Sequence, residues 1–201
     1  PMQRHGLQLM SIGFLVPPSQ AMIWRGPMAS QALDQLLHQT RWDNLDVLIV
    51  DMPPGTGDIQ LSLSQRVPLT GAIIVTTPQD LALIDARKGV AMFEKVGVPI
   101  LGLVENMAVH ICSQCGHEEH IFGQLGAQRL AKDIGARVLG ALPLDIRIRE
   151  QADSGQPTVV ADPKGPLSAH YLDIARAVWA RVGEVSADHK RAFPTIKISK
   201  T

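Results

Sequence analysis

The chain has 201 residues, of which 45% are hydrophobic, with 19 basic and 19 acidic side chains. This length and apolar content are sufficient for one globular domain with a buried core. The formal net charge of zero gives no general attraction to nucleic acid or to an anionic membrane, and no basic stripe interleaved with aromatic residues restores one locally. We therefore expect neither a nucleic-acid partner nor a membrane partner.

Strands and helices alternate along the chain. In chain order, apolar runs and helical spacing predict a strand over 7–12, a helix over 28–37, a strand over 45–51, a helix over 59–67, a strand over 72–76, a helix over 80–96, a strand over 100–104, a helix over 125–134, a strand over 137–141 and a helix over 167–182. Gly135 stands where a glycine ends the helix before it. The run Leu45–Asp51 is typical of a strand buried on both faces. This alternation predicts an α/β fold with a mostly parallel sheet and helices on both faces.

Cysteine usage and targeting patterns indicate the compartment. No apolar run approaches the roughly 20 residues that cross a bilayer, and the first residues lack the zones of a signal peptide. Two cysteines are too few for a disulfide framework, and a close pair in a reducing compartment more often binds metal or does redox chemistry. We therefore expect a cytoplasmic protein.

An acidic side chain ends the second predicted strand of this series. Ligands of open parallel sheets bind beyond the carboxyl ends of the strands, where Asp51 can hold a magnesium ion through water, as the Walker B aspartate of P-loop ATPases does. The prolines and glycines that follow, Gly55 and Gly57 among them, leave backbone N–H groups free for a phosphate. The alternative is a plain turn in which Asp58 caps the next helix. The combination favours a magnesium and phosphate site.

Polar or rigid residues also follow the later strands. The side-chain amide of Asn106 offers the donor and acceptor that pair with an adenine edge, although a lone asparagine there is more often a turn residue. Pro143 could form a wall against a base and Asp145 could accept a hydrogen bond, while the alternative is a loop with a helix N-cap at Asp145. Asp80 is interpreted only as part of the first turn of a helix. Local residues leave nucleotide contact and turn structure both open at Asn106, Pro143 and Asp145.

Several segments, in this order, resemble one protein family. They are VDMPPGTGD at 50–58, TTPQDLALIDARKG at 76–89, GLVENM at 102–107 followed by a CxxC, IFG at 121–123, and ALPLDIRIRE at 141–150 with SGQP after it. Over about residues 7–181 the chain resembles the Mrp/ApbC family of iron-sulfur cluster carrier ATPases. These are deviant P-loop proteins related to the nitrogenase iron protein and to MinD, so the resemblance implies a P-loop NTPase-like fold.

The resemblance implies roles for particular residues. Those that match the family's functional positions are Asp51 as the Walker B aspartate, Gly55, Thr56 and Gly57 as the switch loop that senses the γ-phosphate, Asn106, Pro143 and Asp145 as adenine contacts, and Cys112 and Cys115 as cluster ligands. It further implies ATP and Mg as cofactors of the full-length protein. ATP hydrolysis there would be coupled to the loading or release of a cluster.

Both cysteines fall within the four-residue span Cys112–Cys115. A four-iron four-sulfur cluster normally takes four thiolates, so two copies of the chain are needed to supply them. This count and the resemblance together imply a homodimer with one 4Fe-4S cluster bridging the two cysteine pairs. The partners would be the second copy and the apo iron-sulfur proteins that accept the cluster.

Other interpretations of the cysteines stay open. Cys112, Cys115, His117 and His120 could form a tetrahedral zinc site within one chain, although the single residue between Cys115 and His117 is tight for it. Zinc could also replace iron in isolated material. A redox pair is disfavoured because such pairs follow a strand directly at a helix N-terminus. The cysteines could also be inert in a structural loop.

A nucleotide-switched binding module, like the MinD and ParA proteins on the same scaffold, is the alternative function. Membrane-binding relatives end in a basic amphipathic helix, whereas the C-terminal sequence here contains Pro194 and lacks an apolar face. Residues 186–201 are predicted to be a loose polar tail behind a single domain over 1–185.

The sequence departs from the family pattern in one respect. A glycine-rich phosphate-binding loop with its lysine does not occur among the 201 residues. We therefore expect that this chain by itself does not hydrolyse ATP, although the resemblance implies hydrolysis in the full-length protein. Because Pro1 leads almost directly into apolar sequence, we interpret the chain as the C-terminal portion of a longer carrier.

Overall fold

The computed structural model describes residues 1–15, 26–52, 67 and 69–192. The chain divides into two compact units, an N-terminal unit of residues 1–68 and a C-terminal unit of residues 69–201. Each unit is described by itself. The helix predicted over 59–67 lies outside the described residues except for its last position.

The N-terminal unit contains a short hairpin and a helix. Its elements are β1 (Met2–Arg4), β2 (Leu7–Leu9), the 3-10 helix η1 (Ile12–Phe14) and α1 (Gly26–His38). β1 and β2 pair antiparallel, and α1 confirms the helix predicted over 28–37. The strand predicted over 7–12 ends at Leu9, because the Ser11 side chain caps η1 by accepting a hydrogen bond from Gly13 N.

The strand predicted over 45–51 is not formed. This segment is irregular and mostly exposed, and Ile49 is 87% exposed. Apolar composition alone does not make a strand, because the backbone N–H and C=O groups need a neighbouring strand as hydrogen-bond partner. Among the described residues of the N-terminal unit, only β1 and β2 pair with each other. The prediction of a strand buried on both faces is therefore wrong for this structure.

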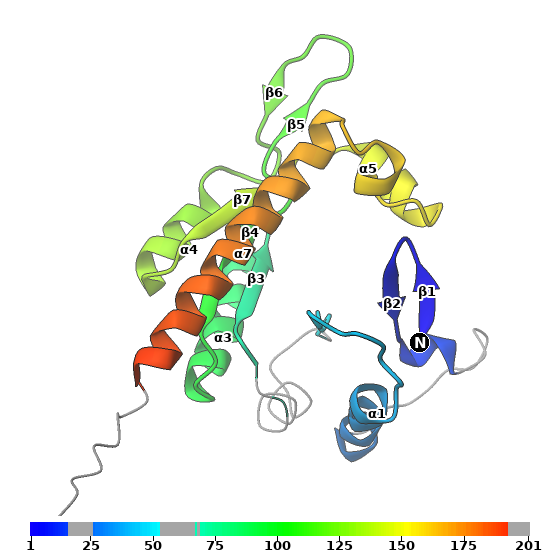
Figure 1. Cartoon of the computed structure of the whole chain (residues 1–201). Coiled ribbons are helices and arrows are strands. Elements are labelled where there is room, and N and C mark those ends of the chain that lie inside the picture. The colour runs from blue at the N-terminus through cyan, green and yellow to red at the C-terminus, as the bar shows by residue number, and fades with distance from the viewer. Residues whose placement is uncertain (16–25, 53–66, 68, 193–201) are drawn as a thin grey trace, which may run out of the picture. The chain divides into compact units, whose positions relative to one another are not determined.

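The C-terminal unit is built on a parallel sheet with the strand order β3-β4-β7. Its elements are β3 (Ala72–Thr76), α3 (Asp80–Lys95), β4 (Ile100–Glu105), β5 (His110–Ile111), β6 (Glu118–Glu119), α4 (Gly126–Ile134), β7 (Val138–Ala141), α5 (Ile146–Asp153), α6 (Thr158–Ala161) and α7 (Pro166–Ala192). α3 and α4 pack on one face of the sheet and α7 packs on the other (Figure 1). The predicted α/β class, with parallel strands and helices on both faces, is confirmed.

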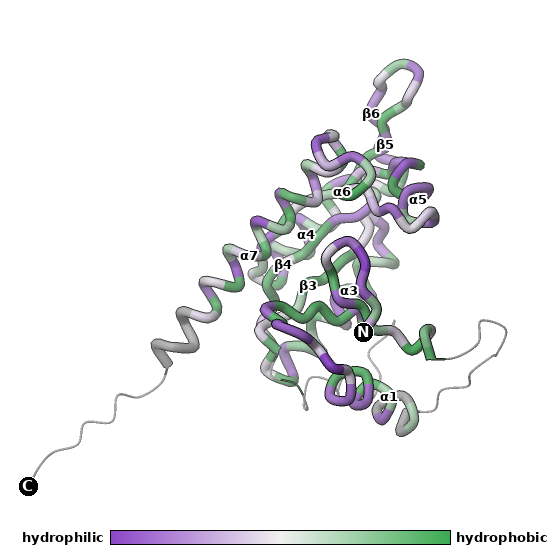
Figure 2. Tube along the Cα trace, turned by 45° about the vertical axis from the view of Figure 1, so that its right-hand side comes forward, coloured by the Kyte–Doolittle hydropathy of each residue, from purple (hydrophilic) through white to green (hydrophobic). Residues whose placement is uncertain are grey.

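Successive residues of β4 point to opposite faces of the sheet, and each face packs a separate core. Leu103, which is 0% exposed, lies in the cluster formed with α3 and α4. Val104, which is 5% exposed, lies in the cluster formed with α7. β4 is buried on both faces, whereas β3 buries only alternate residues and leaves Ile73 and Val75 exposed. α7 alternates between hydrophobic and hydrophilic residues along its length (Figure 2).

Local signals set some of the helix ends and not others. Gly135 ends α4 with a φ of +66°, as predicted from its position. α7 runs on to Ala192, past the predicted end at residue 182, so the predicted tail over 186–201 begins within a helix. In the part of the chain that the structure describes, no helix combines the length and apolarity needed to cross a membrane.

Candidate functional site

Both cysteines lie on a hairpin that was not predicted. β5 and β6 pair antiparallel, with His110 opposite Glu119, and the hairpin projects from the C-terminal unit (Figure 1). Cys112 is half-buried, Cys115 is exposed, and both are free thiols. Strands of two residues each are too short to show hydrophobic periodicity, so only the cysteine spacing pointed to this segment.

Backbone hydrogen bonds shape the tip of the hairpin. Cys112 N donates to His117 O (2.9 Å), and Gly116 N donates to Cys112 O (2.8 Å). Gly116 has a φ of +72°, which a residue without a Cβ adopts readily. The resulting turn places the backbone and side chain of Cys115 within hydrogen-bonding reach of the Cys112 sulfur.

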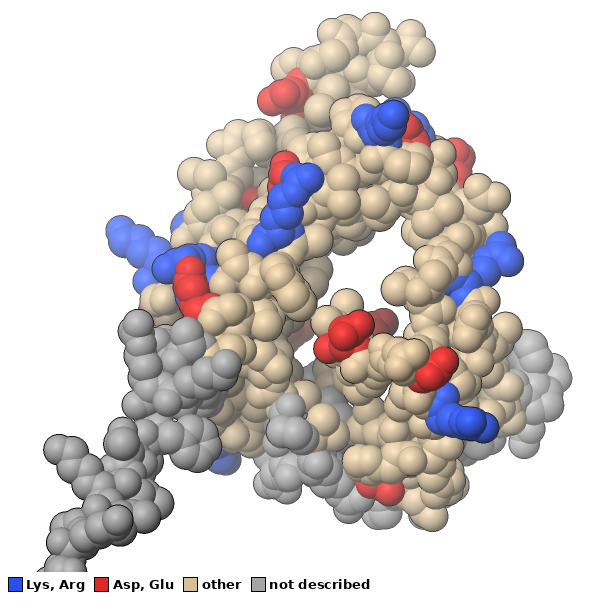
Figure 3. Space-filling model, viewed as in Figure 1, with Lys and Arg blue, Asp and Glu red and all other residues tan. Residues whose placement is uncertain are grey.

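The tip also favours a thiolate at Cys112. The backbone N–H of Cys115, followed by that of Gln114, donates toward the sulfur and lowers the pKa of the Cys112 thiol, while burial and the Glu119 carboxylate oppose this shift. Residues 106–126 contain no Lys or Arg, and Figure 3 shows the projecting hairpin without basic side chains. Backbone dipoles, and not a basic neighbour, therefore prepare this sulfur for a soft metal.

The hairpin of one chain does not assemble a zinc site. His120 Nδ1 lies 2.8 Å from Ala108 O, which engages this ring nitrogen at the base of the hairpin. Within the described residues, which include Cys112, Cys115, His117 and His120, no three His, Cys, Asp or Glu side chains are grouped to hold a metal ion. A metal or cluster bound by the two thiolates would take its remaining ligands from beyond the described residues of the hairpin.

The base of the hairpin is joined to the loop that follows β7. Ala108 N donates to Leu142 O (2.9 Å), and Leu144 N donates to Val109 O (2.8 Å). These bonds continue the parallel pairing of β4 and β7 beyond the strand ends. The cysteine segment therefore leaves the sheet beside one of the loops that carry the predicted adenine contacts.

Two of the predicted adenine contacts lie on these adjoining segments. Asn106 follows β4, and its backbone N donates to Thr76 O of β3 (2.7 Å). Its side-chain Oδ1 accepts a hydrogen bond from Met107 N (2.9 Å), so this oxygen already serves the turn. Pro143 lies in the loop after β7, beside the base of the hairpin. Contact of either residue with adenine stays a prediction.

The third predicted contact, Asp145, caps helix α5. Its Oδ1 accepts hydrogen bonds from the backbone N and from Nε of Arg147 (both 2.9 Å), and its Oδ2 accepts one from Nη2 of Arg147 (2.6 Å). These bonds from Arg147 lower the pKa of the Asp145 carboxyl, although partial burial acts in the opposite direction. The N-cap alternative is the contact seen, and adenine recognition by Asp145 stays a prediction.

The predicted magnesium and phosphate residues belong to the N-terminal unit. Asp51 is exposed and is the last residue of the irregular segment described above. Gly55, Thr56 and Gly57 lie outside the described residues. The roles assigned to these four positions therefore stay predictions.

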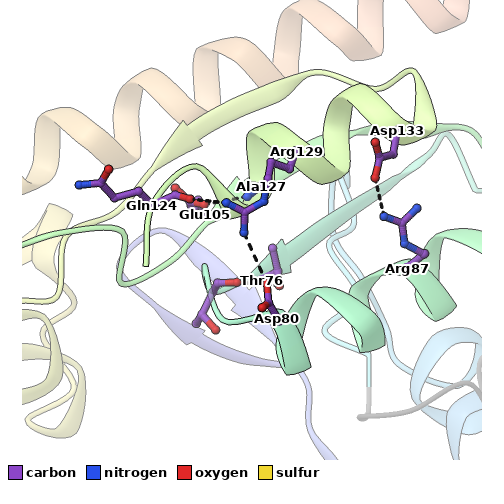
Figure 4. A network of polar contacts seen from close by, with 9 residues as sticks. Thr76, Asp80, Arg87, Glu105, Gln124, Ala127, Arg129 and Asp133 are labelled. Atoms are coloured by element: carbon purple, nitrogen blue, oxygen red, sulfur yellow. Dashed lines mark hydrogen bonds and ion pairs between the residues drawn. The ribbon is translucent and has the colours of Figure 1, made fainter. Parts of the chain in front are cut away.

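Glu105 is a buried carboxylate that sequence reasoning missed. It is 3% exposed at the end of β4, and its Oε1 accepts a hydrogen bond from Ala127 N in the first turn of α4 (2.7 Å) (Figure 4). A signal was present, because an acidic residue ends an otherwise apolar strand, as Asp51 ends an apolar run. The side-chain amide of the next residue, Asn106, was instead assigned a function, contact with adenine.

Two ion pairs join α3 and α4 (Figure 4). Arg87 Nη2 lies 2.7 Å from Asp133 Oδ2, and Arg129 Nη2 lies 3.5 Å from Asp80 Oδ1. All four side chains are more than half exposed, so each pair contributes about 0–1 kcal/mol. These charges line a groove of about 490 Å³ between the two helices, and this groove includes none of the predicted site residues.

A family model and curated proteins match most of the chain. The ParA model described as "NUBPL iron-transfer P-loop NTPase" matches residues 1–179. The "Iron-sulfur cluster carrier protein" of Pseudomonas fragi is 59% identical over 175 residues, which are 87% of this chain and 61% of the relative. The protein of the same name from Escherichia coli K12 is 57% identical over 188 residues (92% and 51%), and the "Iron-sulfur cluster transfer protein NUBPL" of Mus musculus is 51% identical over 182 residues (90% and 57%). The chain thus spans about half to three fifths of the length of these relatives.

Solved structures share the fold. A nucleotide-binding protein of Archaeoglobus fulgidus in complex with ADP superposes with a TM-score of 0.65 at 32% identity, covering 81% of this chain and 61% of that one. The cell division ATPase MinD of Pyrococcus furiosus superposes with a TM-score of 0.56 at 21% identity, covering 78% and 59%. The second likeness concerns the fold alone. Together they confirm the predicted P-loop NTPase-like architecture.

Proposed function

We propose, from the premise that the chain belongs to the family of NUBPL iron-transfer P-loop NTPases, that it binds an iron-sulfur cluster at Cys112 and Cys115 and passes it to other proteins. The observation that carries the proposal is the hairpin tip, where two free cysteines stand in a turn whose backbone N–H groups favour a thiolate. Cysteine thiolates are the common ligands of iron-sulfur clusters. The names of the bacterial relatives, which call them cluster carriers, support this reading of the tip.

The bound species in this proposal is a 4Fe-4S cluster shared by two chains. Such a cluster takes four thiolates, and each chain supplies two. A two-fold homodimer with facing hairpin tips would complete the ligand set. A cluster held at two projecting tips stays partly open to solvent, which suits its release to apo iron-sulfur proteins.

For the full-length protein we extend the proposal to ATP and Mg. Asp51 would hold the magnesium ion as the catalytic Walker B carboxylate, and the switch loop at 55–57 would sense whether the γ-phosphate is present. Asn106, Pro143 and Asp145 would contact adenine. The family resemblance supports these roles, as does the ADP bound by the similar Archaeoglobus protein. Because this chain contains no glycine-rich phosphate loop, it is proposed not to hydrolyse ATP by itself.

The carrier function is proposed ahead of two others. A MinD-like switch module shares the fold, but that likeness at 21% identity says nothing about function. A one-chain zinc site would need His117 and His120 beside the cysteines, and the described residues show no such grouping. Zinc remains a substitute that could occupy the two thiolates in isolated material. We place the carrier in the cytoplasm, as a domain over 1–185 with residues 186–201 as a polar extension.

Anaerobic reconstitution with ferrous iron and sulfide tests the carrier proposal. The chain would be analysed for iron and sulfide content and for mass by native mass spectrometry. We expect a dimer with about two irons and two sulfides per chain, since one 4Fe-4S cluster is shared. The double variant Cys112→Ser/Cys115→Ser should bind neither, while Ser113→Ala, between the two cysteines, should bind as much as the original chain.

Two outcomes would contradict the proposal. One zinc per monomer without sulfide would support the one-chain metal site in place of the shared cluster. A full cluster in Cys112→Ala would show that this cysteine is not a ligand.

A further inference from the structure

The burial of the Glu105 carboxylate calls for a physical reason. A carboxylate that is 3% exposed is costly unless hydrogen bonds and favourable charge compensate for lost hydration. Its Oε1 accepts a hydrogen bond from Ala127 N (2.7 Å), one of the backbone groups that a helix leaves unpaired at its N-terminus. The N-cap residue of α4, Leu125, has no side chain that could make this bond. Glu105 therefore caps α4 from a different element, and the positive end of the helix stabilises its charge.

This hydrogen bond closes the chain segment that carries the cysteines. Glu105 directly precedes residues 106–126, and Ala127 directly follows them. The segment contains β5, β6 and both cysteines. One side chain thus joins the point where the segment leaves β4 to the point where it enters α4 (Figure 4).

Both ends of the same segment hold a bulky residue in the left-handed conformation. Met107 has a φ of +55°, and Leu125 has a φ of +57°. This conformation is unfavourable for residues other than glycine, asparagine and aspartate, and it persists only where the surroundings impose it. The two side chains are 36% and 59% exposed, so burial of the side chain does not impose it. Hydrogen bonds from neighbouring backbone N–H groups to side-chain oxygens supply a constraint instead.

Those hydrogen bonds are present at both ends. Met107 N donates to Asn106 Oδ1 (2.9 Å) at the first end, and Ala127 N donates to Glu105 at the second. Close packing adds to the second end, because a Cβ on Gly126 would lie 2.7 Å from the Cα of Pro78. Arg129 Nη1 also donates to Gln124 O at the second end (2.7 Å), from an exposed side chain. The segment is therefore held between two constrained turns, and Glu105 is the buried charged side chain among these bonds.

We propose that Glu105 is the positioning residue of the cysteine hairpin: its buried carboxylate holds residues 106–126 in one orientation and so sets where Cys112 and Cys115 lie. The proposal rests on the function proposed above, in which two hairpins share a cluster. A shared cluster requires the two cysteine pairs to lie at a fixed separation. A change in the orientation of the hairpin at its base would displace Cys112 and Cys115 at its tip and so alter this separation. Glu105 acts through the backbone of the hairpin and does not touch the cluster.

The test compares Glu105→Ala and Glu105→Gln in the full chain, with Glu94→Ala on the exposed side of α3 as the matched control. After anaerobic reconstitution with iron and sulfide, cluster loss to an excess of chelator is followed by absorbance. Glu105→Ala should lose the cluster about five- to tenfold faster, the factor that corresponds to one lost helix cap. Glu105→Gln keeps an acceptor for Ala127 N and should stay within about twofold, and Glu94→Ala should be unchanged.

Hydrogen exchange separates positioning from a general loss of stability. In apo Glu105→Ala, the amides of Ala127 and of residues 107–125 should exchange faster, while those of β3 and β7 keep their protection. If Glu105→Ala does not fold, Glu105→Asp tests the positioning role instead. Aspartate keeps the carboxylate but is one methylene shorter, so its oxygen lies farther from Ala127 N. This variant should lose the cluster faster than the neutral Glu105→Gln.

Three results would overturn the proposal. They are a release rate for Glu105→Ala equal to that of the original chain, a Glu105→Gln variant as fast as Glu105→Ala, and a Glu105→Asp variant slower than Glu105→Gln. If the original chain takes up no iron and sulfide, the carrier function fails by itself. Hydrogen exchange in apo Glu105→Ala then decides the positioning role, and unchanged exchange over 107–125 would overturn it.

Discussion

The tip and the base of the cysteine hairpin are held by different kinds of contact. At the tip, Cys112 bonds His117 and Gly116 through backbone groups only a few residues apart. At the base, Glu105 reaches Ala127, which is 22 residues away, and Asn106 bonds Thr76 of the neighbouring strand. The tip is thus a product of local sequence, whereas the base depends on the packed sheet. In the proposed function the tip supplies the ligands, and the base sets their position.

Gly126→Ala, at the base, should have the largest effect on folding. The added Cβ would lie 2.7 Å from both Cα and O of Pro78, and backbone atoms cannot move aside as a flexible side chain can. We expect the free energy of unfolding to fall by about 1–3 kcal/mol. Urea denaturation monitored by circular dichroism measures it.

Gly89→Ala in α3 is the matched control for that variant. Its Cβ would meet only Ile74 Cδ1, at an ordinary 3.9 Å. Since alanine also favours a helix over glycine, its stability should stay the same or rise by up to about 1 kcal/mol. Equal stability in the two variants would contradict a tightly packed base.

Gly116→Ala, at the tip, should have a smaller and local effect. No atom lies within 4 Å of the added Cβ, so only the φ of +72° opposes the change, at about 1–2 kcal/mol. Hydrogen exchange should show faster exchange at Cys112 and at position 116, with Ala127 unchanged. Gly116→Asn, which tolerates the left-handed conformation better, should be milder. Faster exchange at Ala127 in Gly116→Ala would show that tip and base are not independent.

Asp145→Asn should have the smallest effect, and it should depend on pH. Arg147 lowers the pKa of the folded Asp145, so the ionised carboxylate stabilises the fold above its unfolded pKa of about 3.9. This contribution is lost as the pH falls through the lower, folded-state value. Asparagine still caps a helix, so only the ion pair is lost, at about 0.5 kcal/mol.

Thermal unfolding across a pH series measures this contribution. The difference between the Asp145→Asn variant and the original chain should be present at neutral pH and vanish in strong acid. A difference that grew as the pH fell would contradict the sign of the pKa shift.

The parallel sheet shows why some elements could be predicted and others could not. β3 has the predicted bounds Ala72–Thr76, and it pairs with β4. The run over 45–51 is equally apolar but forms no strand in this structure. A strand depends on a partner that accepts its backbone hydrogen bonds, and apolar composition carries no information about that partner. The end of α4 was predicted correctly, because Gly135 acts through its own φ, whereas α7 runs on past its predicted end at residue 182.

The candidate site divides in the same way. The spacing of Cys112 and Cys115 identified the ligand pair, since a CxxC turn needs only neighbouring residues to form. The role of Glu105 was missed in favour of Asn106, because the hydrogen-bond partner of its carboxylate, Ala127 N, lies on another element, α4. The N-cap role of Asp145 was foreseen as an alternative, since Arg147 is only two residues away.

The sequence by itself determined the α/β alternation, the cap at Asp145 and the stop at Gly135, the family and the pair of thiols, because each depends on periodicity, on local hydrogen bonds or on motifs in order. Only the tertiary structure decided which apolar runs became strands, that a hairpin carries the cysteines, and that a buried carboxylate closes its base. These outcomes depend on contacts between residues far apart in the chain, whose hydrogen-bond partners are set by packing and not by neighbouring sequence.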